Sequence, residues 1–265
     1  MLTERFPQLK GLILDMDGVL WKDMEPIGDL PLNFRKIREL GLKPVLATNN
    51  STLSASEYQA KCARFGVFLE PEQIITSATL TVSYLKRHFP LQSQVYVIGS
   101  NSFQSMISEA GFAVTNKETK PNANIVVVGL DRELTYKKIG TAANLVRNGA
   151  AFIASNPDST FPTPAGLEPG AGTMVAAVET ASGQKALVLG KPMPHAYLEG
   201  SRYLGLQPHE IMGIGDRLST DIAGAQAAGC LGGFVCSGVN THEEALDWQP
   251  PIDIIAADLW SLLND

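Results

Sequence analysis

Two aspartates one residue apart, Asp15 and Asp17, offer the clearest chemistry in this chain of 265 residues. They follow the apolar run Leu12–Leu14, which predicts a short buried strand, and Gly18 then lets the chain turn away. If the strand ends near Asp15, both carboxylates lie at the carboxyl edge of a sheet, where α/β proteins bind ligands. Two negative charges so close require a cation or a shared proton. At this point an ordinary Asp-Gly turn with a solvated acid explains the pattern equally well.

Two further polar clusters each follow an apolar run that predicts a strand. The run 43–48 ends at Thr48, and Asn49 and Asn50 follow it directly. A hydroxyl together with exposed loop amides is what an anionic phosphate requires. A helix cap explains the same residues. Lys191 follows the run 186–189 and a glycine, and its compact positive charge suits a phosphate or a carboxylate. A lone lysine is otherwise ordinary solvated surface.

A fourth cluster contains two acids five residues apart. Asp216 follows the apolar run 211–214, and Asp221 precedes the helical pattern 222–228. Asp216 can be an ordinary turn residue and Asp221 a helix cap, so each signal is weak alone. Four polar clusters in this order, each at the end of a predicted strand, instead favour one composite site.

Composition limits the classes of function. With 45% hydrophobic and 18% charged residues, the chain is typical of a globular protein and long enough for one large domain or two smaller ones. A net charge of −6 without any basic run argues against nucleic-acid binding. No apolar stretch approaches the roughly 18 residues of a membrane span. Three cysteines without metal-ligand spacing, and an N-terminus without the apolar core of a signal peptide, predict a cytoplasmic protein.

Short apolar runs alternate with helical patterns along most of the chain. The predicted strands after the first are 43–48, 95–98, 125–128, 151–154, 186–189, 211–214, 233–235 and 252–256. The predicted helices are 33–42, 54–65, 136–146, 174–181, 195–204 and 222–228. This alternation predicts an α/β fold with parallel sheets covered on both faces.

The four clusters resemble the four motifs of the haloacid dehalogenase superfamily of phosphatases. The likeness rests on Asp15-Met-Asp-Gly-Val-Leu, Ala47-Thr-Asn-Asn-Ser, Gly190-Lys-Pro and Gly215-Asp-Arg-Leu-Ser-Thr-Asp. The first, second and fourth stretches resemble subfamily IIA, which includes NagD-like, p-nitrophenyl, phosphoglycolate and pyridoxal phosphatases. Residues 128–131 (Val-Gly-Leu-Asp) and 156–173 resemble the large α/β cap of that branch.

The resemblance implies a Rossmann-like catalytic core with a parallel sheet, formed by residues 1–78 and 187–265. An inserted α/β cap domain, which sets substrate specificity, is implied for residues 79–186. All four motifs lie outside this insertion. A second domain above the catalytic site would give a cleft that closes over the substrate.

The resemblance also implies the chemistry of phosphate ester hydrolysis. Asp15 matches the nucleophile that forms an aspartyl-phosphate, and Asp17 matches the general acid and base. Asp15, the backbone carbonyl of Asp17, and Asp216 match the ligands of Mg²⁺. Four residues match the phosphoryl-binding positions: Thr48, Asn49, Asn50 and Lys191. Asp221 is expected to orient the lysine or the metal shell.

Substrate choice is expected to lie with the cap loop 156–163. Asn156 and Asp158 are its candidate substrate-binding residues, and the alternative is a structural Asx turn. Phe161 stands roughly where pyridoxal phosphatases have a histidine, which argues against pyridoxal phosphate. The expected partner is a small phosphomonoester: a sugar phosphate, glycerol phosphate, a nucleotide or p-nitrophenyl phosphate. Neither nucleic acid nor membrane is an expected partner; a homodimer is compatible with the sequence, which leaves the oligomeric state open.

Three alternatives to phosphate ester hydrolysis share parts of this pattern. A haloacid dehalogenase needs neither a second acid nor a metal, so Asp17 argues against that activity. A phosphotransferase or mutase of the same superfamily also passes through a phosphoaspartate and stays an alternative. A non-catalytic phosphometabolite-binding regulator is the other alternative, and the presence of Asp15, Asp17 and Lys191 argues against it.

Overall fold

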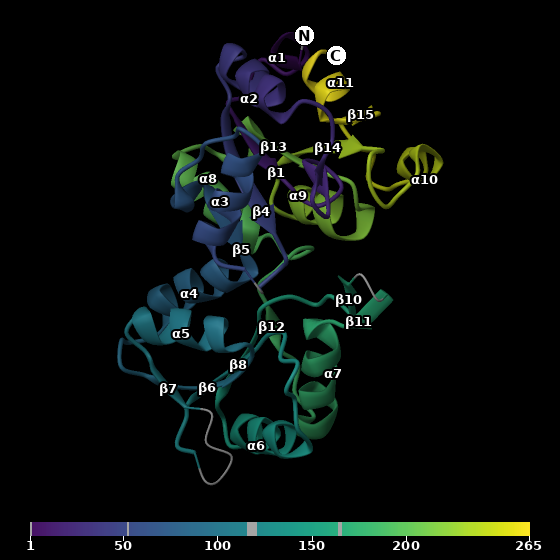
Figure 1. The fold of residues 1–265 in the computed structure, drawn as a ribbon. Helices are drawn as coiled ribbons and strands as arrows, with labels where there is room; N and C mark the ends of the chain where they lie inside the picture. Colours follow the sequence, from purple (N-terminus) through teal and green to yellow (C-terminus); the bar gives the residue numbers. More distant parts are fainter. Residues whose placement is uncertain (1, 52, 116–120, 164–165) are drawn as a thin grey trace. The chain divides into compact units, whose positions relative to one another are not determined.

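The structure is a computed structural model that describes residues 2–51, 53–115, 121–163 and 166–265, with the backbone alone described for 161–163. The chain forms two compact units, whose elements are labelled in Figure 1. The first unit contains the chain up to Thr48, Ala55–Ile75, and everything from Lys191 onward. The second contains Asn49–Ser54 and Thr76–Gly190.

A six-stranded sheet forms the centre of the first unit. Its strands, in spatial order, are β15 (Ile254–Ala256), β14 (Leu231–Val235), β13 (Ile211–Gly215), β1 (Gly11–Leu14), β4 (Lys43–Thr48) and β5 (Ile74–Thr76). The pairs from β15 through β4 are parallel. The chain passes from β1 to β4 on one side and returns to β13 on the other. The carboxyl end of β1 is therefore the switch point of the sheet, where open α/β proteins bind ligands.

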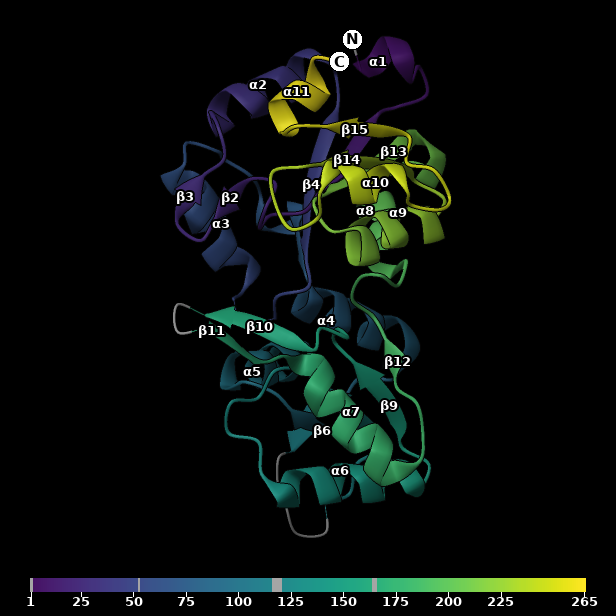
Figure 2. The same ribbon diagram turned by 90° about the vertical axis from the view of Figure 1, so that its right-hand side faces the viewer.

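Helices cover both faces of this sheet. Figure 2 shows α2 (Leu30–Glu39) and α11 (Leu259–Leu263) on one side, with α8 (His195–Leu204) and α9 (Ala223–Ala227) on the other. All four residues of β1 are buried, as expected for a central strand with helices packed on both faces of its sheet. This unit also contains α1 (Leu2–Arg5), β2 (Trp21–Lys22), β3 (Glu25–Pro26), α3 (Ala55–Arg64), α10 (His242–Leu246) and the 3-10 turns Pro71–Gln73 and Pro208–Glu210.

A second parallel sheet organises the second unit. Its spatial order is β12 (Leu187–Val188), β9 (Ala151–Ala154), β8 (Ile125–Val128), β6 (Gln94–Ile98) and β7 (Ala113–Thr115). The helices are α4 (Ser77–His88), α5 (Asn101–Glu109), α6 (Tyr136–Arg147) and α7 (Ala171–Ser182). Alternate residues of β6 and β8, such as Tyr96 and Val126, join the apolar cluster beneath α6 and α7. Strands β10 (Thr160–Thr163) and β11 (Gly166–Pro169) form an antiparallel hairpin.

The predicted parallel α/β architecture is confirmed. Strands 43–48, 125–128 and 151–154 and helix 195–204 have the predicted bounds. Helix 33–42 instead begins at Leu30, because Asp29 caps it by accepting a hydrogen bond from the Leu32 N–H. Helix 222–228 is preceded by a π-helical turn over Leu218–Ile222. None of the described helices is long and apolar enough to cross a membrane.

Candidate active site

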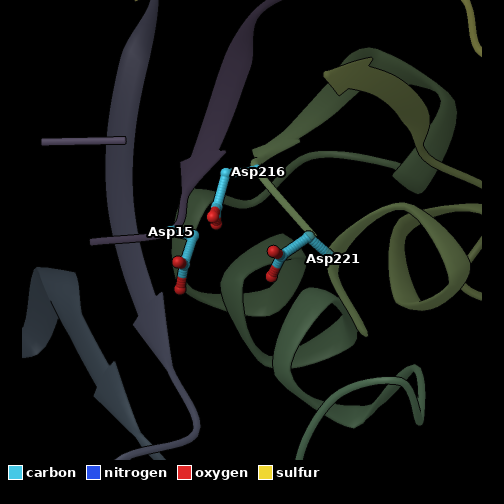
Figure 3. A group of neighbouring side chains, drawn as sticks. All are labelled: Asp15, Asp216 and Asp221. Atoms are coloured by element: carbon cyan, nitrogen blue, oxygen red, sulfur yellow. The ribbon is translucent and has the colours of Figure 1, made fainter. Parts of the chain in front are cut away.

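Three carboxylates converge at the switch point of the first sheet. Asp15 follows β1 directly and donates its backbone N–H to Ile214 of β13 at 2.8 Å. Asp216 follows β13, and Asp221 lies in the π-helical turn after it. Figure 3 shows these three side chains pointing into a common space. One ligand oxygen from each lies within 4.8 Å of those of the other two.

Lys191 is buried among these acids. Its Nζ lies 2.6 Å from Oδ1 of Asp15 and 2.6 Å from Oδ1 of Asp221, and it donates to the carbonyl oxygen of Ala47 at 3.1 Å. Burial disfavours the charged ammonium, but the two carboxylates outweigh it and hold the pKa of Lys191 well above its usual value. Lys191 therefore stays protonated and compensates one of the three negative charges.

Burial also raises the pKa of Asp15 well above its usual value. The attraction of Lys191 opposes this shift, while the charges of Asp221 and Asp216 add to it. When all three carboxylates are ionised, the one ammonium leaves two negative charges without compensation. Oxygen donors with that excess charge suit a hard divalent cation, so the residues fit Mg²⁺.

A loop after β14, residues 237–240, holds Asp216 in place, and sequence reasoning missed it. The Val239 N–H donates to Oδ2 of Asp216 at 2.7 Å, and the Asn240 N–H donates to its carbonyl oxygen at 3.1 Å. A Cβ on Gly238 would lie 1.8 Å from Oδ2 of Asp216, and one on Gly18 2.4 Å from it. Burial raises the pKa of Asp216, and Asp221 adds to this against the Val239 hydrogen bond. The one feature of the sequence that indicates this loop is the end of the predicted strand 233–235, followed by the small residues Ser237 and Gly238.

Asp221 does not cap the following helix, as one interpretation of the sequence held. Its Oδ2 accepts the Arg217 N–H at 3.1 Å, while its Oδ1 contacts Lys191. Its backbone carbonyl accepts the hydroxyl of Tyr197 at 2.8 Å. A Cβ on Gly215 would lie 2.1 Å from Cβ of Asp221, so only glycine permits this approach. Tyr197 is a further residue that no sequence motif indicated.

Asp17 is not part of the three-carboxylate group, and part of its surface is exposed. Its Oδ1 accepts a hydrogen bond from Nε1 of Trp21 at 3.0 Å. Burial raises the pKa of this carboxyl, while Lys61 and the Trp21 hydrogen bond oppose the shift. A partly exposed acid whose pKa is raised can exchange a proton with a reacting group.

Thr48 is buried at the end of β4, and the predicted phosphate-binding residues after it belong to the second unit. There Nδ2 of Asn49 donates to Oδ1 of Asp158 at 3.0 Å, and the carbonyl oxygen of Asn49 accepts Nδ2 of Asn156 at 2.8 Å. Asn50 follows, half-buried. The structure thus brings Asn49, Asn156 and Asp158 together in one network of the second unit.

The Asx turn considered for the loop 156–163 is present. Oδ1 of Asn156 accepts the Asp158 N–H at 3.1 Å, and Asn156 is 4% exposed. Asp158 is half-buried. The sequence predicts that Phe161 replaces a histidine of pyridoxal phosphatases, but its side chain is not among those that the structure describes.

Nearly the whole chain is similar to known proteins of one family. A model of the haloacid dehalogenase-like hydrolases matches residues 12–113, and a second, described as HAD-hydrolase-like, matches residues 188–262. An acid sugar phosphatase of Staphylococcus aureus is 32% identical over 92% of this chain and 93% of its own.

Solved structures share the fold. A p-nitrophenyl phosphatase from Archaeoglobus fulgidus superposes with a TM-score of 0.89 at 27% identity, over 97% of this chain and 98% of its own. A glycerol phosphate phosphatase from Mycobacterium tuberculosis in complex with magnesium gives a TM-score of 0.87 at 30% identity, over 97% of this chain and 77% of its own. The predicted resemblance to subfamily IIA and its Rossmann-like fold is confirmed.

Proposed function

Because the chain belongs to the haloacid dehalogenase-like hydrolases, we propose that it hydrolyses small phosphomonoesters through an aspartyl-phosphate on Asp15. The observation that carries the proposal is the 2.6 Å contact between Asp15 and the buried ammonium of Lys191, at the switch point of the sheet. The ammonium can donate to a phosphoryl oxygen of the ester and so hold the phosphorus beside the carboxylate oxygen that attacks it. Relatives named for sugar phosphates, p-nitrophenyl phosphate and glycerol phosphate support this class of substrate.

The two acids of the first motif divide the chemistry. In the first step an oxygen of Asp15 attacks phosphorus, the bond to the leaving oxygen breaks, and Asp17 protonates that oxygen. In the second step water attacks the phosphorus, Asp17 takes the proton of the water, and Asp15 and inorganic phosphate are released. Burial raises the pKa of Asp17, so more of it is protonated for the first step.

Mg²⁺ fits the carboxylates of this site, and we assign Asp15, Asp216 and the backbone carbonyl of Asp17 to hold it. The bound ion neutralises charge that builds on the phosphoryl oxygens. Val239 keeps Asp216 oriented through its N–H. Asp221 holds the ammonium of Lys191 against Asp15, so we assign it an orienting role.

The remaining predicted residues are assigned to binding. Thr48, Asn49, Asn50 and Lys191 bind the phosphoryl group. We assign segments 1–78 and 187–265 to the catalytic core and the inserted segment 79–186 to binding the rest of the substrate, with Asp158 as its contact and Asn156 shaping the loop through the Asx turn. Asp158→Ala should change kcat/KM unequally between two dissimilar substrates, by about 1–3 kcal/mol. Equal changes for both substrates would remove Asp158 from this role.

The test is a screen of phosphorylated metabolites for phosphate release with Mg²⁺ present. The wild-type protein should release phosphate, and Asp15→Asn should not, because the isosteric amide is a far weaker nucleophile. Acid quenching during turnover should leave a phosphoryl group on Asp15, located by peptide mass spectrometry. A phosphoryl group on another residue, or turnover by purified Asp15→Asn, would overturn the proposal.

A further inference from the structure

Trp21 lies four residues after Asp17 and is fully buried in β2. A buried indole N–H needs a hydrogen-bond acceptor, and here the acceptor is Oδ1 of Asp17 at 3.0 Å. An indole donates only, so the proton of a neutral Asp17 must sit on the other oxygen, Oδ2. We propose that Trp21 is a positioning residue that presents Oδ2 of Asp17 to the leaving group. This inference rests on the proposed function.

The backbone closes the same loop on itself. The Gly18 N–H donates to the carbonyl oxygen of Trp21 at 2.8 Å, and the N–H of Trp21 donates to the carbonyl oxygen of Met16 at 3.2 Å. The Leu20 N–H also donates to Met16, at 2.8 Å. Asp17 and Trp21 are therefore joined through main chain and side chain within one tight turn, which restricts the rotamers of both.

Helix α3 and the residue after it hold the indole from outside the turn. Nζ of Lys61 lies 4.2 Å from the centroid of the indole ring, in the position of a cation–π contact. The ring of Phe65 packs on the indole with centroids 5.8 Å apart.

A positioned acid matters most where the leaving group is poor. An alkoxide such as that of glycerol leaves only with a proton, whereas p-nitrophenolate is a stable anion that needs little assistance. General acid catalysis typically contributes about 10²–10⁴-fold. Loss of positioning should therefore slow phosphoryl transfer from glycerol phosphate while barely affecting p-nitrophenyl phosphate, which a general loosening of the site would not do.

The experiment is single-turnover transfer to Asp15, measured by rapid quench for both substrates, in Trp21→Phe. Phenylalanine keeps an aromatic ring and removes the N–H. We expect transfer from glycerol phosphate to slow at least about tenfold more than transfer from p-nitrophenyl phosphate. Trp248→Phe is the matched control, because its indole donates a similar bond, to Gln226 at 3.1 Å, outside the site. It should slow both substrates equally or not at all.

Equal slowing of both substrates in Trp21→Phe would overturn the inference. If that variant does not fold, Phe65→Leu decides, because it removes the ring that packs on the indole and leaves every charge in place. The ratio of the two rates should shift in the same direction, and an unchanged ratio in Phe65→Leu would then overturn the inference. Failure of the wild-type protein to release phosphate from any compound of the metabolite screen would instead overturn the proposed function.

Discussion

Replacing Gly238 by alanine tests how the loop after β14 sets metal affinity. The new Cβ would lie 1.8 Å from Oδ2 of Asp216 and 2.3 Å from its Cγ. Ordinary contact requires about 3.5 Å, so the carboxylate or the loop must move by about 1.7 Å. The backbone of Gly18 also lies close to this oxygen, because a Cβ built there would be 2.4 Å from it. The φ angle of Gly238 is not in the left-handed region, so the effect is steric.

The expected magnitude follows from the geometry that Mg²⁺ demands. The ion binds oxygen at about 2.0–2.1 Å in a nearly ideal octahedron, so a carboxylate displaced by about 1.7 Å leaves its shell. Loss of outer-shell support alone typically costs about 10–100-fold in metal affinity. We therefore expect Gly238→Ala to weaken Mg²⁺ binding at least about 100-fold, which corresponds to about 2.8 kcal/mol.

The assay is isothermal titration of the purified protein with Mg²⁺, together with the Mg²⁺ concentration that gives half-maximal phosphate release. Gly232→Ala is the matched control, because the nearest atom to its Cβ would be 3.7 Å away, an ordinary contact. Its Mg²⁺ affinity should equal that of the wild-type protein.

Two results would refute the reasoning. Unchanged Mg²⁺ affinity in a folded Gly238→Ala protein would mean that Asp216 is not a ligand or that the loop does not hold it. Equal weakening in Gly232→Ala would mean that any substitution in this region loosens the site. Circular dichroism and a urea titration establish that both variants are folded.

Three further predictions concern charge, thiols and metal. Lys191→Met should lower the free energy of unfolding, measured by urea titration, by about 3–5 kcal/mol, because it leaves buried carboxylates without their positive partner. Lys138→Met should lower it less, because the ammonium of Lys138 is more exposed. Equal losses in the two variants would contradict this prediction. Burial raises the pKa of Cys62 to about 11 and that of Cys230 to about 12. At pH 8 iodoacetamide should therefore alkylate the more accessible Cys236 first, as followed by mass spectrometry, and alkylation of the other two thiols should become faster as the pH rises. Early alkylation of the two buried thiols would contradict this prediction. EDTA should abolish phosphate release and lower the Tm of the protein, and added Mg²⁺ should restore both, because an ion that binds only the folded protein stabilises the folded state. Full turnover in the presence of chelator would contradict a role of the metal in catalysis.

The sequence by itself determined the strands and the ends at which they place polar residues. Short, continuously apolar runs between polar segments predict buried strands, and β8 and β9 have their predicted bounds. Parallel strands bring their carboxyl ends to one edge, so Asp15 and Asp216 were predicted to share a site. The family motifs added roles that spacing alone left open.

The tertiary structure alone decided how the polar groups pair. Lys191 meets Asp15 across 176 residues, and Val239 meets Asp216 across 23 through a backbone N–H that carries no sequence signal. Asp221 was equally compatible with a helix cap, since an acid before a helix fits both roles locally. Trp21 reads as an ordinary apolar residue until its N–H is seen on Asp17. Local patterns predict burial and period, but a hydrogen bond depends on the position of both partners in space, which only the packed chain supplies.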